Sequence, residues 1–359
     1  MAKPSPRETT LQRLTAVRRH LDSQRINTLL VTFPPHVRYL TRFSGSNACC
    51  VITAQTAAFF TDGRYKTQAR EEVVGYRVYI AAGTLFQEIR NRRIISRAGR
   101  VGFNPTTLRI AELESLKALF PSVRFSKVKN ILDDLAAVKD VTEIARIRKA
   151  VSVSDEVFRS VLPLLKPGIS ELDIAAEIVY QHRRRGAEAD AFEPIVASGP
   201  RGAFPHARAT RKRVARGEFV TMDFGCRVEG YHSDLTRTVS VGKPGIRQRK
   251  IYQAVLEAQQ LAVEAARAGM RAADLDAVAR KSISRAGFAR YFPHSLGHGL
   301  GLQVHENPRL SALSKDVLRE GNVVTIEPGV YVPGVGGVRI EDDVVIRNRH
   351  AEVLTTSPK

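Results

Sequence analysis

The first part of the chain alternates between apolar runs and helical patterns. Between Glu8 and Ile26 the apolar residues lie three or four positions apart, which predicts an amphipathic helix. The apolar run TLLVTF (28–33) then predicts a buried strand that Pro34 and Pro35 stop. Further elements are predicted as strands at 49–53, 57–62, 76–81 and 123–128, helices at 64–73, 85–96 and 107–120, and a short turn at ILDDL (131–135). This alternation predicts an α/β unit of three layers.

The pattern changes at Asp140. Glu143 follows three residues later, which is the spacing of a capping box, and a long helical pattern continues until Pro167-Gly168. Later elements are predicted as helices at 170–185, 246–267 and 272–286, and as strands at 193–199, 218–225 and in the Gly- and Val-rich last part of the chain. We therefore expect an α/β domain at 1–135 and an α+β domain at 136–359.

Composition fits a globular protein of two domains. A chain of 359 residues is long for one core, and 43% hydrophobic with 26% charged residues is ordinary. The formal net charge of +20 raises the question of a nucleic-acid partner. The basic residues are dispersed, however, and only short clusters occur, at 90–93, 183–185 and 211–213. An Arg-rich background explains this pattern better, so we do not expect nucleic acid as a partner.

The cysteines and the hydropathy pattern bear on the compartment. The three cysteines, two of them adjacent, match neither a disulfide framework nor a zinc ribbon, which favours a reducing compartment. No run of 18 apolar residues exists, and the N-terminal stretch MAKPSPRETT has no apolar signal core. We expect a cytoplasmic protein that has no membrane association.

Five residues in the last third of the chain are candidates for a metal site. They are four carboxylates and one imidazole, and each lies in a short stretch that contains glycine or has a strand-like pattern. The residues are Asp223 in TMDFG, Asp234 in HSDLTRT, His298 in GHGLGL, Glu327 in TIEPGVY and Glu341 in VRIEDDVVI. Ligand sets dominated by oxygen suit hard or borderline divalent ions, and two neighbouring ions need about this many carboxylates. The pattern favours a two-metal hydrolytic site.

Each candidate also has a simpler interpretation. Asp223 alone would be a turn residue at a strand end, and Asp234 alone would be an N-cap. Glu341 would fit an exposed edge strand, with Asp342 and Asp343 as neighbours that are easily confused with it. If the strands are buried, however, unpaired carboxylates in them would be costly. We also expect Glu341 to share a strand face with Arg339, two positions earlier.

The segment FPHSLGHGLGLQVHENP (292–308) concentrates histidines among glycines. His294 and His298 are four positions apart, as in a helical zinc pair, but the glutamate of an HExxH motif is missing. Glycine at this density allows close backbone approach to a ligand and disfavours a long helix. The DFG at 223–225 does not indicate a kinase, because no Gly-rich loop, matching Lys or HRD segment accompanies it.

These stretches together resemble a known family. In their order and sequence, they resemble the motifs of the Xaa-Pro aminopeptidase and prolidase branch of the pita-bread metallopeptidases. The segments that carry the resemblance are VASG (196–199), the Pro205-His206 pair, DFG, GYHSDLTRT, GHGLGLQVHENP, TIEPGVY and VRIEDDVVI. Methionine aminopeptidase and creatinase are more distant relatives. YLTRFSGSNA (39–48) and FFTDGRY (59–65) resemble the creatinase-type N-terminal domain. The resemblance implies a creatinase-like α/β domain at 1–135 and a pita-bread α+β catalytic domain at 136–359. Arg42 is a departure, because the family commonly has Gly there.

The resemblance also implies roles for individual residues. It implies that Asp223, Asp234, His298, Glu327 and Glu341 hold two divalent ions, with Mn²⁺ as the expected metal and Co²⁺ or Zn²⁺ as substitutes. Glu327 would also be the general base. His206 and His305 would contact the substrate carbonyl and stabilise the tetrahedral intermediate, and His294 would line the proline pocket. Arg339 would contact the substrate region and orient the metal-site carboxylates.

The implied function is hydrolysis of the bond between an N-terminal residue and proline, in peptides or in X-Pro dipeptides, by a homodimer. One alternative is an aminopeptidase of another specificity on the same site, although the large N-terminal domain argues against methionine aminopeptidase. Another is a metal-free pita-bread protein that binds RNA or ribosomes, and creatinase-like amidinohydrolysis is a third. The complete ligand set disfavours the last two. The sequence does not separate aminopeptidase P from prolidase.

Overall fold

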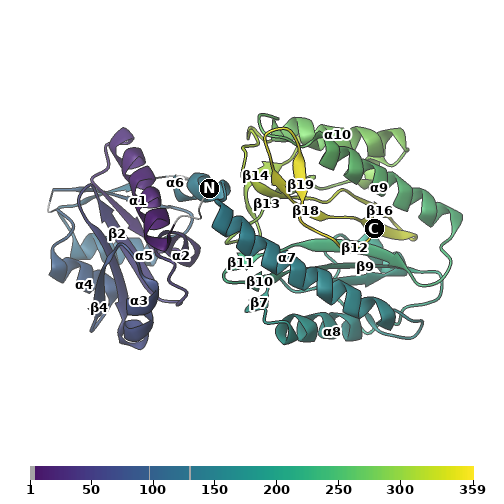
Figure 1. Cartoon of the computed structure of the whole chain (residues 1–359), viewed down its shortest axis with the longest axis horizontal. Coiled ribbons are helices and arrows are strands. Elements are labelled where there is room, and N and C mark those ends of the chain that lie inside the picture. Colours follow the sequence, from purple (N-terminus) through teal and green to yellow (C-terminus); the bar gives the residue numbers. More distant parts are fainter. Residues whose placement is uncertain (1–4, 97, 129–130) are drawn as a thin grey trace. The chain divides into compact units, whose positions relative to one another are not determined.

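The structure is a computed structural model that describes residues 5–96, 98–128 and 131–359. The chain forms two compact units, Met1–Ala136 and Ala137–Lys359 (Figure 1). Residues 1–4, the start of the N-terminal stretch that we expect to carry no signal sequence, lie outside the described residues.

The first unit is built on one mixed sheet of six strands in the order β4-β3-β2-β1-β5-β6. The strands are β1 (Thr28–Val31), β2 (Ala48–Thr53), β3 (Ala57–Asp62), β4 (Arg77–Ala81), β5 (Arg100–Phe103) and β6 (Arg124–Lys127). β1 is antiparallel to β2 and parallel to β5, and parallel neighbours require crossover connections. The α/β class predicted for this part of the chain is confirmed.

Helices supply the crossovers and cover the sheet. They are α1 (Pro6–Ser23), α2 (Pro34–Thr41), η1 (Gly63–Tyr65), α3 (Lys66–Glu72), α4 (Leu85–Arg92), α5 (Ile110–Leu119) and α6 (Ile131–Ala137). Ile89 of α4 and Leu116 of α5 pack against the sheet residues Val51, Phe60 and Val101 in one apolar core. The first strand ends at Val31, before Pro34 and Pro35, as predicted. The two prolines also form the first turn of α2, where the missing N–H of proline has no helical partner to lose. The predicted turn at ILDDL is wrong, because this segment is helical.

The second unit begins with two capped helices, α7 (Val141–Val161) and α8 (Glu171–Arg184), separated by the short helix η2 (Leu162–Leu164). Asp140 accepts hydrogen bonds from the backbone N–H groups of Thr142 and Glu143, which confirms the predicted capping box. Ser170 caps α8 in the same way through Asp173. The remaining helices are η3 (Gly199–Ala203), α9 (Ile246–Ala265), α10 (Ala272–Arg285) and η4 (Ala289–Tyr291).

Two sheets lie between these helices (Figure 1). One has the order β12-β9-β8 and the other β14-β13-β15-β18-β19. Their strands are β8 (Ile195–Ser198), β9 (Phe219–Phe224), β12 (Leu235–Ser240), β13 (Gly297–Gly299), β14 (Glu306–Leu310), β15 (Val323–Ile326), β18 (Asp342–Ile346) and β19 (Ala351–Val353). Smaller ladders are formed by β7 (Ala189–Asp190), β10 (Cys226–Val228) and β11 (Tyr231–His232), and by β16 (Gly329–Val332) with β17 (Gly336–Arg339).

Each sheet has its own apolar core on its helix side. Val157 and Phe158 of α7 and Ile174 of α8 pack against the strands that carry Val220 and Met222. The helices α9 and α10 pack in the same manner against the second sheet, in a core that includes Val324, Val344 and Ile346. The helices cover the outer face of each sheet. The polar side chains on the inner faces of the two sheets therefore face one another.

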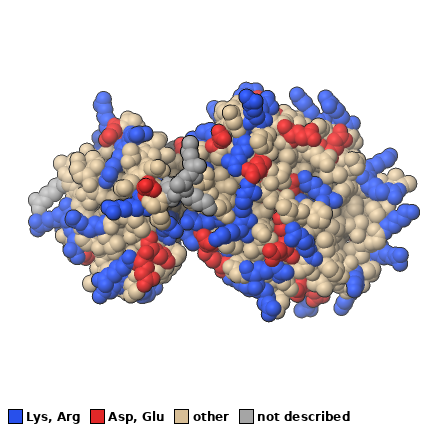
Figure 2. Space-filling view, in the orientation of Figure 1, with Lys and Arg blue, Asp and Glu red and all other residues tan. Residues whose placement is uncertain are grey.

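Charge and hydropathy of the described residues add two observations. On the face shown in Figure 2, Lys and Arg side chains are scattered and Asp and Glu lie among them. Among residues 5–96, 98–128 and 131–359, no helix is both long and apolar enough to cross a membrane.

Candidate metal centre

The five candidate ligands come from both sheets of the second unit. Asp223 lies in β9, the central strand of its sheet, and Asp234 immediately precedes β12, which pairs antiparallel with β9. The other three belong to the second sheet and its connections: His298 in β13, Glu327 directly after β15, and Glu341 directly before β18. Residues that are more than a hundred positions apart therefore meet between the sheets.

Three of these side chains form a tight cluster. One ligand atom each from Asp234, His298 and Glu341 lie within 4.8 Å of one another. The His298 Nε2 atom is 3.7 Å from Asp234 Oδ2 and 3.4 Å from Glu327 Oε1. Asp223 is close enough for its charge to act on Asp234, Glu327 and Glu341. The structure thus brings all five candidates to one place.

The orientation of His298 suits a metal ligand. Its Nδ1–H donates to the carbonyl oxygen of Gly299 at 3.0 Å, so the lone pair is on Nε2, the atom that faces the carboxylates. Burial lowers the pKa of His298 to about 4, which keeps the imidazole neutral. A Cβ atom on Gly297 or Gly299 would lie 2.1 or 2.2 Å from a carbonyl oxygen of a neighbouring strand. Any larger residue at position 297 or 299 would clash with the neighbouring strands, which explains why His298 has glycine on both sides.

The carboxylates are buried with too few partners. Burial and the neighbouring carboxylates raise the pKa values of Asp234 and Glu341 well above their ordinary range, and burial raises the pKa of Glu327 to about 8. Among the described residues, Asp223 Oδ1, Asp234 Oδ1 and Glu341 Oε1 are buried and have no hydrogen-bond partner. Buried carboxylate oxygens are costly when they are unsatisfied. A cluster of unpartnered oxygens around a neutral imidazole nitrogen fits divalent cations.

Arg339 connects the cluster to the surrounding residues. Its guanidinium forms an ion pair with Asp223 and donates to Thr236 Oγ1 at 3.1 Å. It also donates to Tyr331 Oη at 2.7 Å, and that hydroxyl lies 2.9 Å from His294 Nε2. Since Nδ1–H of His294 donates to the Ser295 carbonyl, the Tyr331 hydroxyl is the donor to Nε2. His294 is thereby held neutral, and burial lowers its pKa to about 4.

His206 and His305 lie at the solvent side of the cluster. Both are exposed, and the His305 ring is edge-on to the His298 ring with centroids 4.4 Å apart. His206 is close enough for its charge to act on both His294 and His305. The structure therefore places His206, His294 and His305 near one another and His305 beside the candidate ligand His298.

Several expectations are changed by the structure. Glu327 does not lie within one long strand but between β15 and β16. Arg339 and Glu341 do not share a strand face, because β17 ends at Arg339 and β18 begins at Asp342. Glu341 is 1% exposed beside a strand flanked by two others, which excludes the exposed edge strand.

Sequence reasoning also missed several contacts of the site. Thr236 Oγ1 donates to Glu341 Oε2 at 2.6 Å, and Tyr331 links Arg339 to His294. Asp343 Oδ2 accepts from the Asp234 backbone N–H at 2.9 Å. The only available signal was that these residues stand next to the candidate ligands in the same motifs.

Comparison with known proteins agrees with this geometry. Residues 145–348 match the model of metallopeptidase family M24, and residues 13–138 match the creatinase/prolidase N-terminal domain. An Xaa-Pro dipeptidase from Pyrococcus furiosus is 36% identical over 97% of this chain and 99% of its own length.

Two solved structures show the same fold over nearly the whole chain. An Xaa-Pro dipeptidase from Bacillus anthracis is 36% identical with a TM-score of 0.94, covering 98% of each chain. An X-Pro aminopeptidase from Thermotoga maritima is 34% identical with a TM-score of 0.86, covering 94% of this chain and 98% of that one. The expected creatinase-type domain and pita-bread catalytic domain are confirmed. The chain belongs to metallopeptidase family M24 and carries the creatinase/prolidase N-terminal domain.

Proposed function

We propose that this metallopeptidase hydrolyses the bond between an N-terminal residue and proline, with X-Pro dipeptides as the first substrate class to test. The observation that carries the proposal is the cluster of Asp234, His298 and Glu341, whose ligand atoms lie within 4.8 Å of one another beside buried oxygens that lack partners. We assign Asp223 and Glu327 to the same pair of metal positions, because both interact electrostatically with this cluster.

Two bound divalent ions supply Lewis-acid polarisation of the scissile carbonyl and a water of lowered pKa. We assign Glu327 to receive the proton of the attacking water and to hand it to the leaving nitrogen, because its carboxylate lies 3.4 Å from His298 Nε2 at the edge of the cluster. We assign His206 and His305 as hydrogen-bond donors to the substrate carbonyl, where charge develops during attack. Their exposure leaves their rings accessible to a substrate.

Recognition of proline fits the other side of the site. A bond to proline has no N–H and its neighbour is conformationally restricted, so it cannot be held as an ordinary β-strand substrate. Both ring nitrogens of His294 are engaged within the protein, so this side chain presents a ring surface instead of a donor. We propose that His294 and Tyr331 form a wall against which the proline ring packs.

The identity of the metal, the cellular compartment and the oligomeric state are also part of the proposal. We propose Mn²⁺ as the metal, since ligand sets rich in carboxylate suit it, although Co²⁺ and Zn²⁺ fit the same donors. Cys49, Cys50 and Cys226 are all buried free thiols, which supports a reducing cytoplasm. A homodimer is proposed from the family resemblance alone.

Relatives named for two substrate classes share this fold. The length of the substrate peptide therefore distinguishes a dipeptidase from an aminopeptidase. The Bacillus anthracis protein is described as an Xaa-Pro dipeptidase and the Thermotoga maritima protein as an X-Pro aminopeptidase. The deciding experiment reconstitutes the purified chain with Mn²⁺ and compares X-Pro with X-Pro-Y-Z and with X-Ala. Release from X-Pro alone supports a dipeptidase, and release from both proline substrates supports an aminopeptidase.

Cleavage of X-Ala at the same rate would replace the proposal by an aminopeptidase of another specificity. No release from any substrate by protein that holds two Mn²⁺ would overturn it. Asp234→Asn is the matched control, because it keeps the shape of a side chain in the cluster and removes its charge. RNA binding by a metal-free preparation would favour the non-enzymatic alternative, which the set of unpartnered carboxylates does not support.

A further inference from the structure

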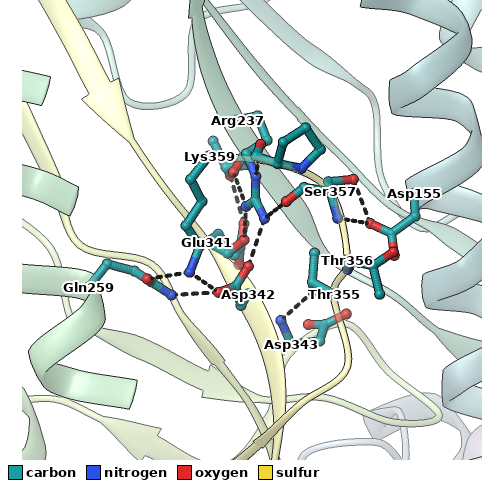
Figure 3. Close-up of polar contacts among 12 residues, drawn as sticks. Asp155, Arg237, Gln259, Glu341, Asp342, Asp343, Thr355, Thr356, Ser357 and Lys359 are labelled. Atoms are coloured by element: carbon teal, nitrogen blue, oxygen red, sulfur yellow. Dashed lines mark hydrogen bonds and ion pairs between the residues drawn. The ribbon is translucent and has the colours of Figure 1, made fainter. Parts of the chain in front are cut away.

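A fully buried arginine lies next to the candidate ligand Glu341 (Figure 3). Arg237, in β12, is 1% exposed, and each of its five N–H donors has an acceptor. The acceptors are the carbonyl oxygens of Thr236, Glu341, Ser357 and Pro358 and the carboxylate of Asp342. Burying a guanidinium is costly unless it is paired and fully hydrogen-bonded, and the five acceptors meet this condition for Arg237.

The contacts of Arg237 join the two sheets at the candidate ligands. One nitrogen, Nη1, donates to the carbonyl oxygens of both Thr236 and Glu341. Thr236 belongs to the first sheet, and Glu341 directly precedes β18 of the second. The Glu341 N–H donates to the Thr236 carbonyl at 3.1 Å, and Thr236 Oγ1 donates to Glu341 Oε2. Backbone and side chain of Glu341 are therefore held against β12 at the residue beside Arg237.

The two acidic residues that follow Glu341 complete the junction. Asp342 Oδ1 accepts from Arg237 Nη2 at 2.8 Å, while Oδ2 accepts from Gln259 of α9 and from Lys359. Asp343 Oδ2 accepts from the backbone N–H of Asp234 at 2.9 Å. The three consecutive acidic residues thus make different contacts. The side chain of Glu341 faces the metal cluster, that of Asp342 pairs with Arg237, and that of Asp343 accepts from the backbone of the candidate ligand Asp234.

The segment 355–359 lies beside Arg237 (Figure 3). Its Ser357 and Pro358 carbonyls accept from Nη2 and Nε of Arg237 at 2.8 and 3.0 Å. Asp155 of α7 anchors the segment by accepting from the N–H and hydroxyl groups of Thr356 and Ser357. One continuous set of hydrogen bonds therefore runs from α7 through the segment and Arg237 to the backbone of Glu341.

We propose that Arg237, held by residues 355–359, is a positioning residue of the metal centre that sets the separation of Asp234 and Glu341 across the two sheets. The inference rests on the proposed function, because it takes these two carboxylates as metal ligands. None of the five atoms that accept from Arg237 is a candidate metal-ligating atom, so Arg237 would act through the residues that it holds. Ligand separation matters because the ions need their oxygens at nearly constant distances, and partners behind the ligands control metal affinity roughly 10–100-fold.

The test measures metal binding directly, on the full-length chain freed of metal with a chelator. Calorimetric titration with Mn²⁺ is compared for the natural chain, Arg237→Met and a chain that lacks residues 355–359, with circular dichroism as the check of folding. Arg237→Lys is the conservative variant, which keeps the charge but offers three donors in place of five. The expected result is two Mn²⁺ for the natural chain and a loss of tenfold or more in affinity for at least one Mn²⁺ in the Met and deletion variants, with partial rescue by Lys.

Glu171→Gln is the matched control. Glu171 is equally buried and accepts hydrogen bonds from Ser198, Arg201 and Thr210, but it contacts none of the candidate ligands. We expect both Mn²⁺ affinities to stay within threefold in this variant. The visible absorption spectrum of bound Co²⁺ gives a second readout, which should change in Arg237→Met and not in Glu171→Gln.

The outcomes separate this inference from the proposed function. If the natural chain binds fewer than two Mn²⁺, the proposed metal centre fails. If it binds two, and Arg237→Met and the deletion bind both with unchanged affinity, the positioning role is wrong. An equal loss of affinity in Glu171→Gln would also overturn it, because general destabilisation would then explain the effect. Should Arg237→Met fail to fold, the deletion decides, since it leaves every residue of both sheets in place.

Discussion

At the scale of single residues, the site is defined by the atoms that each side chain leaves without partners. His298 commits Nδ1 to the Gly299 carbonyl and keeps the Nε2 lone pair for the cluster. Asp234 and Glu341 each keep one buried oxygen that has no partner among the described residues. His294, by contrast, commits both nitrogens and is left with a ring surface only. Residues of the same type therefore differ in what they offer to a ligand.

Replacing Glu327 by Gln tests its proposed role in proton transfer. An amide cannot accept and return a proton, so we expect kcat on an X-Pro substrate at saturating Mn²⁺ to fall by roughly 10²–10⁴-fold. Glu257→Gln, an exposed position on α9, is the control and should keep full activity. Retention of more than a tenth of kcat in a folded, metal-loaded Glu327→Gln protein would rule out the assignment.

His294 should make stability depend on pH. Burial lowers the pKa of its imidazole to about 4, with smaller contributions from the charges of Arg339, His206 and Arg280. Between the ordinary pKa of about 6.5 and this lowered value, the unfolded chain binds a proton that the folded chain does not. Protonation of His294 therefore lowers stability as pH decreases through this window, by up to about 3 kcal/mol. The raised pKa values of Asp234, Glu327 and Glu341 act in the opposite direction in metal-free protein, so the contribution of His294 is read from the difference between the natural chain and a His294 variant.

The measurement is urea unfolding of metal-free protein at several pH values from 7 to 4. His294→Gln should show a shallower decline than the natural chain. His350→Gln, which alters an exposed histidine, should keep the full decline. An equal slope in the natural chain and in His294→Gln would contradict the assignment of a depressed pKa to this residue.

At the scale of elements, local sequence rules worked where the deciding contacts are local. Asp140 and Ser170 cap α7 and α8 as their spacing predicts, because a capping box needs only residues three positions apart. The rules failed at ILDDL, which is helical and not a turn. They identified the end of the strand before Pro34 but not the helix α2 that begins there, because proline is compatible both with a strand end and with a first helical turn.

The end of α2 contains a testable strain. Arg42 is the C-cap residue and has a left-handed backbone with φ of 71°, a conformation that glycine adopts without steric cost. Arg42→Gly should raise the free energy of unfolding of this unit by up to about 1 kcal/mol, as measured by urea unfolding. Lys117→Gly, at an exposed position within α5, should lower it by about 1 kcal/mol. Equal destabilisation by both changes would show that the left-handed position carries no strain.

At the scale of the whole molecule, the two units should respond differently to metal. All candidate ligands belong to Ala137–Lys359, so metal binding stabilises that unit, by about 2.7 kcal/mol for each site when the free metal is at 100 times its Kd. In scanning calorimetry, removal of metal with a chelator should lower the transition of the second unit and leave that of Met1–Ala136 unchanged. Glu341→Gln should abolish most of this shift. Parallel movement of both transitions would show that the units do not unfold independently.

The sequence by itself determined the class of each unit, the capped helices and the five candidate ligands, because periodicity, capping and motif wording are local properties of the chain. Tertiary structure alone decided that Asp223 and Asp234 from one sheet face His298, Glu327 and Glu341 from the other. It also decided the burial of Glu341 and the contacts of Arg237 with residues 355–359. These depend on the packing of two sheets between two pairs of helices, which brings together residues more than a hundred positions apart and which no local pattern encodes.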